Sequence, residues 1–200
     1  MTEQPDSASA PETMPSLRTL PRGVQVGVGL LVAVAIILGV ALFNRDSGGA
    51  GLTDPGRTVP RVGERLAALP LTTMDGTPFD MATLNGHPVW INFWAAWCGA
   101  CKAEMPDLQT VYAQERAAHP DLILLLVNTA DVRQDGLKYY QDLHMTGTLV
   151  FNDGSNDVGP YRITNFPTHL MIDRNGVVQR VLQRPLNPET ARQELQHITG

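Results

Sequence analysis

The chain contains two cysteines, Cys98 and Cys101, separated by Gly99 and Ala100 in the segment "NFWAAWCGACKAEMP". A pair with this spacing can form one disulfide, supply half of a metal site, or exchange disulfides with other thiols. A structural zinc site takes four ligands, and the histidines are scattered without ligand spacing: His87, His119, His144, His169 and His197. A structural disulfide across so short a loop adds little stability. The pair is therefore predicted to be redox-active, with neither a metal nor an organic cofactor.

The position of the pair favours redox chemistry. The apolar run "PVWINFW", from Pro88 to Trp94, is typical of a buried strand, and a helix is expected to begin near Cys98. Free N–H groups and the dipole at a helix N-terminus stabilise an anion, here the Cys98 thiolate. Cys98 is therefore expected to be exposed and nucleophilic. Cys101 lies one turn deeper, where it could attack a mixed disulfide at Cys98 and release the product.

Three helices are predicted in the domain that carries the pair. The first follows Cys98, and apolar spacing gives it this inner face: Met105, Leu108, Val111 and Tyr112. The second covers residues 132–143, with this inner face: Val132, Leu137, Tyr140 and Leu143. The last is expected after Asn187, which is a good N-cap, with Pro188 at the first helical position.

Strands are expected around these helices. "DLILLLVNT", from Asp121 to Thr129, is a buried run, and "TLVFNDG" is a short strand with a turn. "PTHLMID" and "VVQRVL" flank "RNG" and predict an antiparallel hairpin, and the Asp75-Gly76 turn in "TTMDGTPF" predicts another. Strands that alternate with helices and then close in a hairpin predict an α/β fold with a mixed central sheet flanked by helices.

An apolar run precedes the domain. Residues 24–43, "VQVGVGLLVAVAIILGVALF", contain Gln25 as the only polar side chain. As a helix they would extend roughly 30 Å, the thickness of a bilayer core, which predicts a transmembrane anchor. A cleaved signal peptide is the alternative, because "SGGAG" follows, although its apolar region is ordinarily shorter. Residues 1–23 are predicted to be a disordered tail, 44–60 a flexible linker and 61–200 the folded domain.

Charge indicates the compartment and the partners. Arg18 and Arg22 precede the apolar run and Arg45 follows it, so the positive-inside bias is slight. A short tail inside and a large domain outside is the simpler topology. It places the cysteines in an oxidising compartment, where disulfides persist. The net charge of -5 and the lack of a basic cluster argue against a nucleic-acid partner.

The segments "FWAAWCGACKAEMP", "DGTPFDMATLNGHPVWINFW" and "NFPTHLMIDRNGVV" occur in an order that resembles thioredoxin-fold proteins. The resemblance covers about residues 62–198 and is greatest to membrane-anchored, extracytoplasmic thiol-disulfide oxidoreductases of the TlpA/ResA type, which include the cytochrome c maturation thioredoxins. It implies a thioredoxin fold in which Cys98 attacks and Cys101 resolves. It also implies that Trp97 shields the site and that Pro167 is a cis-proline opposite the disulfide. From the sequence alone, Pro167 could equally be an ordinary strand-initiating proline.

The resemblance further implies roles for neighbouring residues. In the resembling family, a glutamate at the position of Glu104 is partly buried and transfers protons at the active site. Burial beside a thiol would let it take or supply the Cys101 proton. Trp97, Phe166 and Thr168 are expected to contact the substrate. The spacer Gly99-Ala100, where thioredoxin has Gly-Pro, is expected to tune the redox potential.

Three departures from the family pattern bear on the site. Asn92 stands where thioredoxin has a buried aspartate, which leaves Glu104 as the nearby carboxylate. Phe166 is bulkier than the residue usual before the cis-proline and could narrow the substrate groove. Trp94 and His169 are interpreted as packing residues.

The sequence therefore predicts a protein-disulfide reductase at the outer side of a prokaryotic cytoplasmic membrane. Its expected partners are protein disulfides such as that of apocytochrome c, a transmembrane thiol-electron donor, and the bilayer through residues 24–43. A redox-sensing or redox-inert binding module on the same anchor is the alternative. A peroxidase is disfavoured because "AAWCGAC" lacks the Pro/Thr-containing loop of thioredoxin-fold peroxidases.

Overall fold

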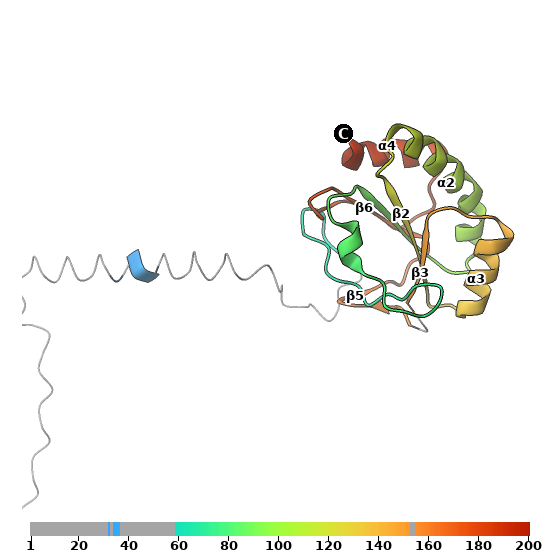
Figure 1. The fold of residues 1–200 in the computed structure, drawn as a ribbon, viewed down its shortest axis with the longest axis horizontal. Coiled ribbons are helices and arrows are strands. Elements are labelled where there is room, and N and C mark those ends of the chain that lie inside the picture. Colours follow the sequence, from blue (N-terminus) through green and yellow to red (C-terminus); the bar gives the residue numbers. More distant parts are fainter. Residues whose placement is uncertain (1–31, 33, 37–58, 153–154) are drawn as a thin grey trace, which may run out of the picture. The chain divides into compact units, whose positions relative to one another are not determined.

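A computed structural model describes residues 32, 34–36, 59–152 and 155–200 (Figure 1). Residues 32 and 34–36 are helical, and the rest of the predicted tail and anchor, with the linker up to residue 58, lies outside the described residues. Within the described part, no helix combines the length and the apolar character that a bilayer crossing needs. The folded domain belongs to the second of two units, Thr53–Gly200, which is described here by itself.

A five-stranded mixed sheet forms the centre of the domain, in the order β3-β2-β1-β6-β7. Its strands have these bounds: β1 Val89–Trp94, β2 Ile123–Thr129, β3 Thr148–Asn152, β6 Thr168–Ile172 and β7 Val178–Leu182. β2 pairs parallel to β1 and β3, whereas β6 pairs antiparallel to β1 and β7. The predicted α/β fold with a mixed sheet is confirmed.

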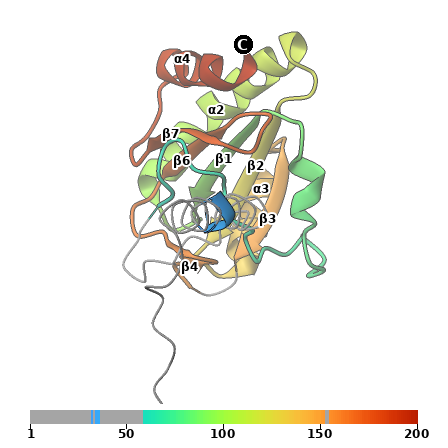
Figure 2. The same ribbon diagram turned by 90° about the vertical axis from the view of Figure 1, so that its left-hand side faces the viewer.

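Helices cover one face of this sheet. Their bounds are α2 Gly99–Ala118, α3 Arg133–Asp142 and α4 Pro188–Thr199. α2 and α4 lie side by side across the sheet (Figure 2). The predicted inner face of α2 is buried at all four positions, where it joins Trp90 and Trp94 of β1 in one apolar cluster. The predicted N-cap also forms, because Asn187 accepts a hydrogen bond from the Thr190 N–H (2.8 Å).

The opposite face is covered by non-helical chain. Ile91 and Phe93 of β1 pack there against Leu69 and Leu71 in a second apolar cluster. A short 3-10 helix, η2 (Met81–Leu84), and the strand pair β4 (Asp157–Val158) and β5 (Tyr161–Arg162) lie in this covering part of the chain. Because both faces of β1 are covered, all six of its residues are buried, which explains the continuous apolar run in the sequence.

Two sequence expectations differ from the fold. Val132 and Leu143 flank α3 instead of forming its inner face, and they are 62% and 42% exposed. The buried residue of α3 is Gly136, because only a residue without a side chain fits against Asn128. The Asp75-Gly76 turn forms as well, with Gly76 at φ 87°, but an isolated bridge beside it replaces the predicted hairpin.

Gly136→Ala is expected to lower the free energy of unfolding by about 1–2 kcal/mol. A Cβ there would lie 2.6 Å from the Asn128 side chain, and overpacking outweighs the better helix propensity of alanine. Urea denaturation of the oxidised protein measures the change. The matched control is Gly99→Ala, also in a helix, where a Cβ meets no atom within 4 Å and no loss is expected. Equal stability of the two variants would contradict this packing.

Candidate active site

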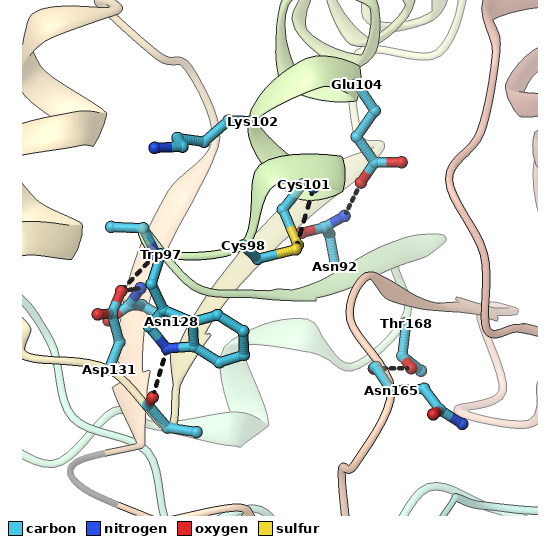
Figure 3. The surroundings of a disulfide bond; sticks show 12 residues. Asn92, Trp97, Cys98, Cys101, Lys102, Glu104, Asn128, Asp131, Asn165 and Thr168 are labelled. Carbon is cyan, nitrogen blue, oxygen red and sulfur yellow. Dashed lines mark hydrogen bonds between the residues drawn. A yellow bond between two sulfur atoms is a disulfide. The ribbon is translucent and has the colours of Figure 1, made fainter.

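The two cysteines form a disulfide at the N-terminus of α2 (Figure 3), with an S–S distance of 2.12 Å. β1 ends at Trp94 and α2 begins at Gly99, so four residues carry the chain from the sheet into the helix. Cys98 is the N-cap of α2, and its Sγ accepts a hydrogen bond from the Cys101 N–H (3.1 Å). The helix therefore begins where the sequence predicted, with one of its free N–H groups directed at the first sulfur.

The two cysteines differ in exposure. Cys98 is 5% exposed and Cys101 is fully buried. The prediction that Cys98 is exposed is wrong, because Cys98 belongs to the apolar cluster under α2, although it is the less buried of the two cysteines. Gly99 and Ala100 are both exposed. The spacer therefore presents backbone and one methyl group around Cys98, with no charged or hydrogen-bonding side chain.

An aromatic pair borders the exposed edge of Cys98. Trp97 is 60% exposed, and its ring meets the Phe166 ring edge-on at 5.5 Å. The Trp97 Nε1–H donates to the carbonyl oxygen of Ala130 (2.8 Å). Together with the spacer and neighbouring chain, these rings line a shallow open recess: Trp97, Cys98, Gly99, Ala100, Thr164, Asn165, Phe166 and Gln183. Trp97 and Phe166 therefore lie beside Cys98, and their contact with a substrate stays a prediction.

Asp131 supports this rim, a role that the sequence did not reveal. Its carboxylate accepts hydrogen bonds from the Ala96 N–H (2.5 Å), the Asn128 Nδ2–H (2.8 Å) and the Val132 N–H (2.8 Å). Ala130, whose carbonyl holds Trp97, has φ 54°, an uncommon value for a residue with a side chain. In the sequence, an aspartate between a predicted strand and a predicted helix was the signal that could have revealed this role. Through its hydrogen bonds, Asp131 connects the residues before Cys98 to the end of β2.

The chain before β6 forms the other wall. The Phe166–Pro167 peptide bond is cis, as the resemblance implied. Thr168 differs from expectation, because its side chain is fully buried and its Oγ1 donates to the Asn165 carbonyl (2.7 Å). That hydroxyl is therefore used to hold the loop, and the side chain of Thr168 does not line the recess.

Glu104 lies behind the disulfide, on the first turns of α2, and is 4% exposed. Its Oε1 accepts a hydrogen bond from the Asn92 Nδ2–H (3.0 Å), and its Oε2 accepts one from the Leu186 N–H (2.9 Å). Figure 3 shows Asn92 between the Glu104 carboxylate and the cysteines. The burial implied by the resemblance is present, and the carboxylate is held by donors from β1 and from the loop before α4.

A histidine completes this buried group. Asn92 and His169 are directly paired residues of β1 and β6, and His169 is fully buried. Its Nε2 lies 3.3 Å from Glu104 Oε2, and its Nδ1 accepts a hydrogen bond from the Trp90 Nε1–H (3.3 Å). The packing interpretation was therefore incomplete. Alternate residues of a strand point to the same face, so Trp90 and Asn92 lie on one face of β1. This alternation was the signal that could have revealed a shared polar partner.

Trp94, in contrast, packs as predicted. It is fully buried, and its ring lies 5.7 Å from that of Tyr139 on α3. Pro106 lies inside α2 and has no N–H, so the Lys102 carbonyl lacks its helical partner. The Tyr139 hydroxyl donates to that carbonyl (3.2 Å), while partial burial raises the pKa of Tyr139. α3 thus supports the first turns of α2, from which Glu104 projects.

No three His, Cys, Asp or Glu side chains in the described part of the chain form a group that could hold a metal ion. The chemistry available at the site is that of two sulfurs, one buried carboxylate and one buried imidazole. Two rings and a cis-proline loop define the approach to the sulfurs. This arrangement suits transfer of a disulfide between Cys98–Cys101 and an outside partner.

Comparison with other proteins agrees with this arrangement. A profile of the AhpC/TSA family matches residues 62–181. The chain belongs to the AhpC/TSA family. The solved structures of a thioredoxin family thiol:disulfide interchange protein from Chlorobium tepidum TLS and of StoA from Bacillus subtilis share its fold. The first has a TM-score of 0.57 at 23% identity and covers 72% of this chain and 100% of its own. StoA has a TM-score of 0.52 at 22% identity, and the match covers 65% of this chain and 98% of StoA.

Relatives of this AhpC/TSA family member carry the name thiol-disulfide oxidoreductase ResA. The protein from Geobacillus thermodenitrificans (strain NG80-2) is 25% identical over 142 residues, which are 71% of this chain and 80% of the relative. The protein from Halalkalibacterium halodurans is 22% identical over 154 residues, 77% and 82% of the two chains. The predicted resemblance and the predicted enzyme class, thiol-disulfide oxidoreductase, are confirmed.

After reduction, iodoacetamide is expected to label Cys98 well before Cys101. Cys98 keeps the exposed edge and lies at the helix N-terminus, which favours its thiolate, whereas Cys101 is covered. Peptide mass spectrometry after brief labelling measures the order. Cys101→Ser should label as fast as wild type and Cys98→Ser much more slowly. Equal labelling of the two cysteines would contradict the assigned order of attack.

Proposed function

We propose that this thiol-disulfide oxidoreductase is tethered to a prokaryotic cytoplasmic membrane and reduces protein disulfides on its outer side, the cysteine pair of an apocytochrome c among them. The observation that carries the chemistry is the Cys98–Cys101 disulfide at the start of α2 with buried Glu104 behind it. The membrane tether and the cytochrome substrate are supported by the apolar segment 24–43 and by the TlpA/ResA-type resemblance.

The reaction proceeds in two exchanges. In the reduced protein, the Cys98 thiolate attacks one sulfur of the substrate disulfide. A new S–S bond forms, the substrate's own S–S bond breaks, and its second sulfur leaves with the electron pair and takes a proton. Cys101 then attacks Cys98 Sγ, which forms the internal disulfide and releases the first substrate sulfur. The substrate gains two electrons and two protons, and the enzyme dithiol loses them.

Glu104 removes the Cys101 proton in the second exchange. Cys101 is fully buried, so bulk water has no direct access to its thiol. The Glu104 carboxylate lies on the same side of α2, three residues along, which is one helical turn. When the attack is complete, the proton can follow the leaving thiolate to the surface. A buried base beside a buried thiol is the arrangement that this step requires.

Two neighbours of the sulfurs, the spacer and Glu104, support a reducing direction, although the helix N-terminus itself favours the Cys98 thiolate. An oxidant of this class is one whose reduced form is stabilised. Here the spacer Gly99-Ala100 adds no charge or side-chain donor to the Cys98 thiolate, and the nearby Glu104 is acidic. Neither feature favours accumulation of thiolate. A transmembrane thiol-electron donor would then restore the dithiol after each turnover.

The recess favours a protein substrate. Trp97 and Phe166 expose aromatic surface beside the attacking sulfur, and Val132, 62% exposed, lines a second recess that also reaches Trp97. The family resemblance implies that the Phe166 backbone, to which an extended peptide strand could pair, faces a bound substrate. An apolar segment around a cysteine pair therefore fits the site better than a small polar thiol does.

Activity and direction are tested together. Full-length protein is expected to catalyse insulin reduction, and Cys98→Ala is expected to abolish it. The midpoint potential of the pair, measured against glutathione or dithiothreitol, should be near or below about -270 mV, as for a reductant. A value near about -120 mV would indicate an oxidant. Equal turnover of insulin by wild type and Cys98→Ala would favour the binding module. Turnover of hydrogen peroxide alone would favour the peroxidase.

The membrane tether is tested separately. Full-length protein expressed in a bacterium should stay in the membrane fraction after a carbonate wash, whereas a variant without residues 24–43 should not. Cys98 in intact spheroplasts should react with a membrane-impermeant maleimide after mild reduction. Labelling only after lysis would place the domain inside and contradict the proposed topology.

A further inference from the structure

His169 lies in a polar environment that a packing role does not require. Its ring is fully buried on β6. Nε2 lies 3.3 Å from Glu104 Oε2, while Nδ1 lies 3.3 Å from Trp90 Nε1 and 3.2 Å from Asn92 Nδ2. All the close polar neighbours of the ring therefore belong to the group that holds the active-site carboxylate.

The neighbours of Nδ1 decide which nitrogen carries the proton. The indole Nε1 of Trp90 is a donor only, so it needs an acceptor at Nδ1. Asn92 also directs its NH₂ group there, since its other hydrogen bond goes to Glu104 Oε1. His169 Nδ1 is therefore unprotonated, and the neutral ring carries its proton on Nε2, facing Glu104 Oε2.

The Glu104 carboxylate accepts hydrogen bonds from the Asn92 and Leu186 N–H groups, and His169 Nε2 lies 3.3 Å from Oε2 without the alignment of a hydrogen bond. The three groups come from β1, from the loop before α4 and from β6. Together these contacts hold the carboxylate in one orientation.

We propose that His169 is a positioning residue whose Nε2–H, 3.3 Å from Glu104 Oε2, keeps that carboxylate oriented for the Cys101 proton. His169 acts through Glu104, and in this step the proton passes from Cys101 Sγ to the carboxylate while the ring keeps its own. The inference rests on the proton-accepting role proposed above for Glu104. It is independent of the membrane tether and of the identity of the substrate.

Other titratable or charged side chains on the elements around His169 do not contact Glu104 or His169. The titratable or charged groups at the start of α2, on α2, β7, the following loop and α4 are these: Cys98, Cys101, Lys102, Asp107, Tyr112, Glu115, Arg116, Arg180, Arg184, Glu189, Arg192, Glu194 and His197. The Arg180 guanidinium, by hydrogen-bonding Glu194, holds the pKa of that carboxyl below its usual value, and His197 lies 3.8 Å from it. Within the described residues, none of these side chains bonds to Glu104 or His169.

The experiment follows the second exchange directly. Reduced full-length protein is mixed with excess 5,5′-dithiobis(2-nitrobenzoate), and thionitrobenzoate release is recorded by stopped flow. The first release reports attack by Cys98 and depends on reagent concentration. The second reports attack by Cys101 and does not. Its rate is measured against pH for wild type, His169→Asn and His169→Gln.

The two substitutions are matched. A glutamine can accept from Trp90 and still extend an N–H toward Glu104, whereas the shorter asparagine keeps only the acceptor. In His169→Asn the second phase should slow about tenfold across the pH profile, the expected effect of losing one polar contact to a charged group. His169→Gln should stay near wild type. An unchanged profile in His169→Asn would overturn the inference.

Two further measurements separate the possible failures. If Glu104→Gln leaves the second phase unchanged, the proposed role of Glu104 fails. If Glu104→Gln slows it but His169→Asn does not, only the present inference fails. Nitrogen NMR of wild type at about pH 8, where imidazole is ordinarily neutral, needs no variant to fold. It should show the Nε2–H tautomer of His169, and the Nδ1–H tautomer would contradict the geometry.

Discussion

A carboxylate inside the apolar cluster is the constraint around which this domain is arranged. Moving an isolated charge from water into a protein interior costs roughly several kcal/mol, unless hydrogen bonds within the protein replace those to water. Glu104 receives them from a side chain of β1 and a main-chain N–H before α4, with the His169 ring of β6 close by. The sheet order places β6 beside β1, and α4 lies against α2. The topology therefore delivers the partners of Glu104 from segments far apart in the sequence.

The same arrangement gives the two sulfurs different surroundings. Cys98 has an exposed edge, a helix N-terminus and an aromatic rim, so it can meet a partner. Cys101 is fully buried, and Glu104, one helical turn along, is the base that we propose for its proton. Division of the two exchanges between the cysteines thus follows from their depth on one helix. Asp131 and Tyr139 contribute by fixing the chain on either side of the pair.

Local patterns predicted much of this structure. The C-x-x-C spacing, the strand before it and the inner face of α2 were readable because they depend on neighbouring residues. Pro167 and Glu104 needed the family resemblance, since the cis bond and the burial depend on distant chain. The polar contacts of His169 could not be predicted for the same reason, because its partners come from β1 and α2. Val132 and Leu143 were placed inward because their spacing fits a helix, but they are the residues just before and just after α3.

The central claim is that Glu104 takes the Cys101 proton while the internal disulfide forms. Time-resolved infrared spectroscopy of the reduced protein, during its reaction with an aromatic disulfide, tests this most directly. A carboxylic-acid C=O band should rise together with the second thiolate release, and it should be missing in Glu104→Gln. Disulfide closure at the wild-type rate without such a band would contradict the account.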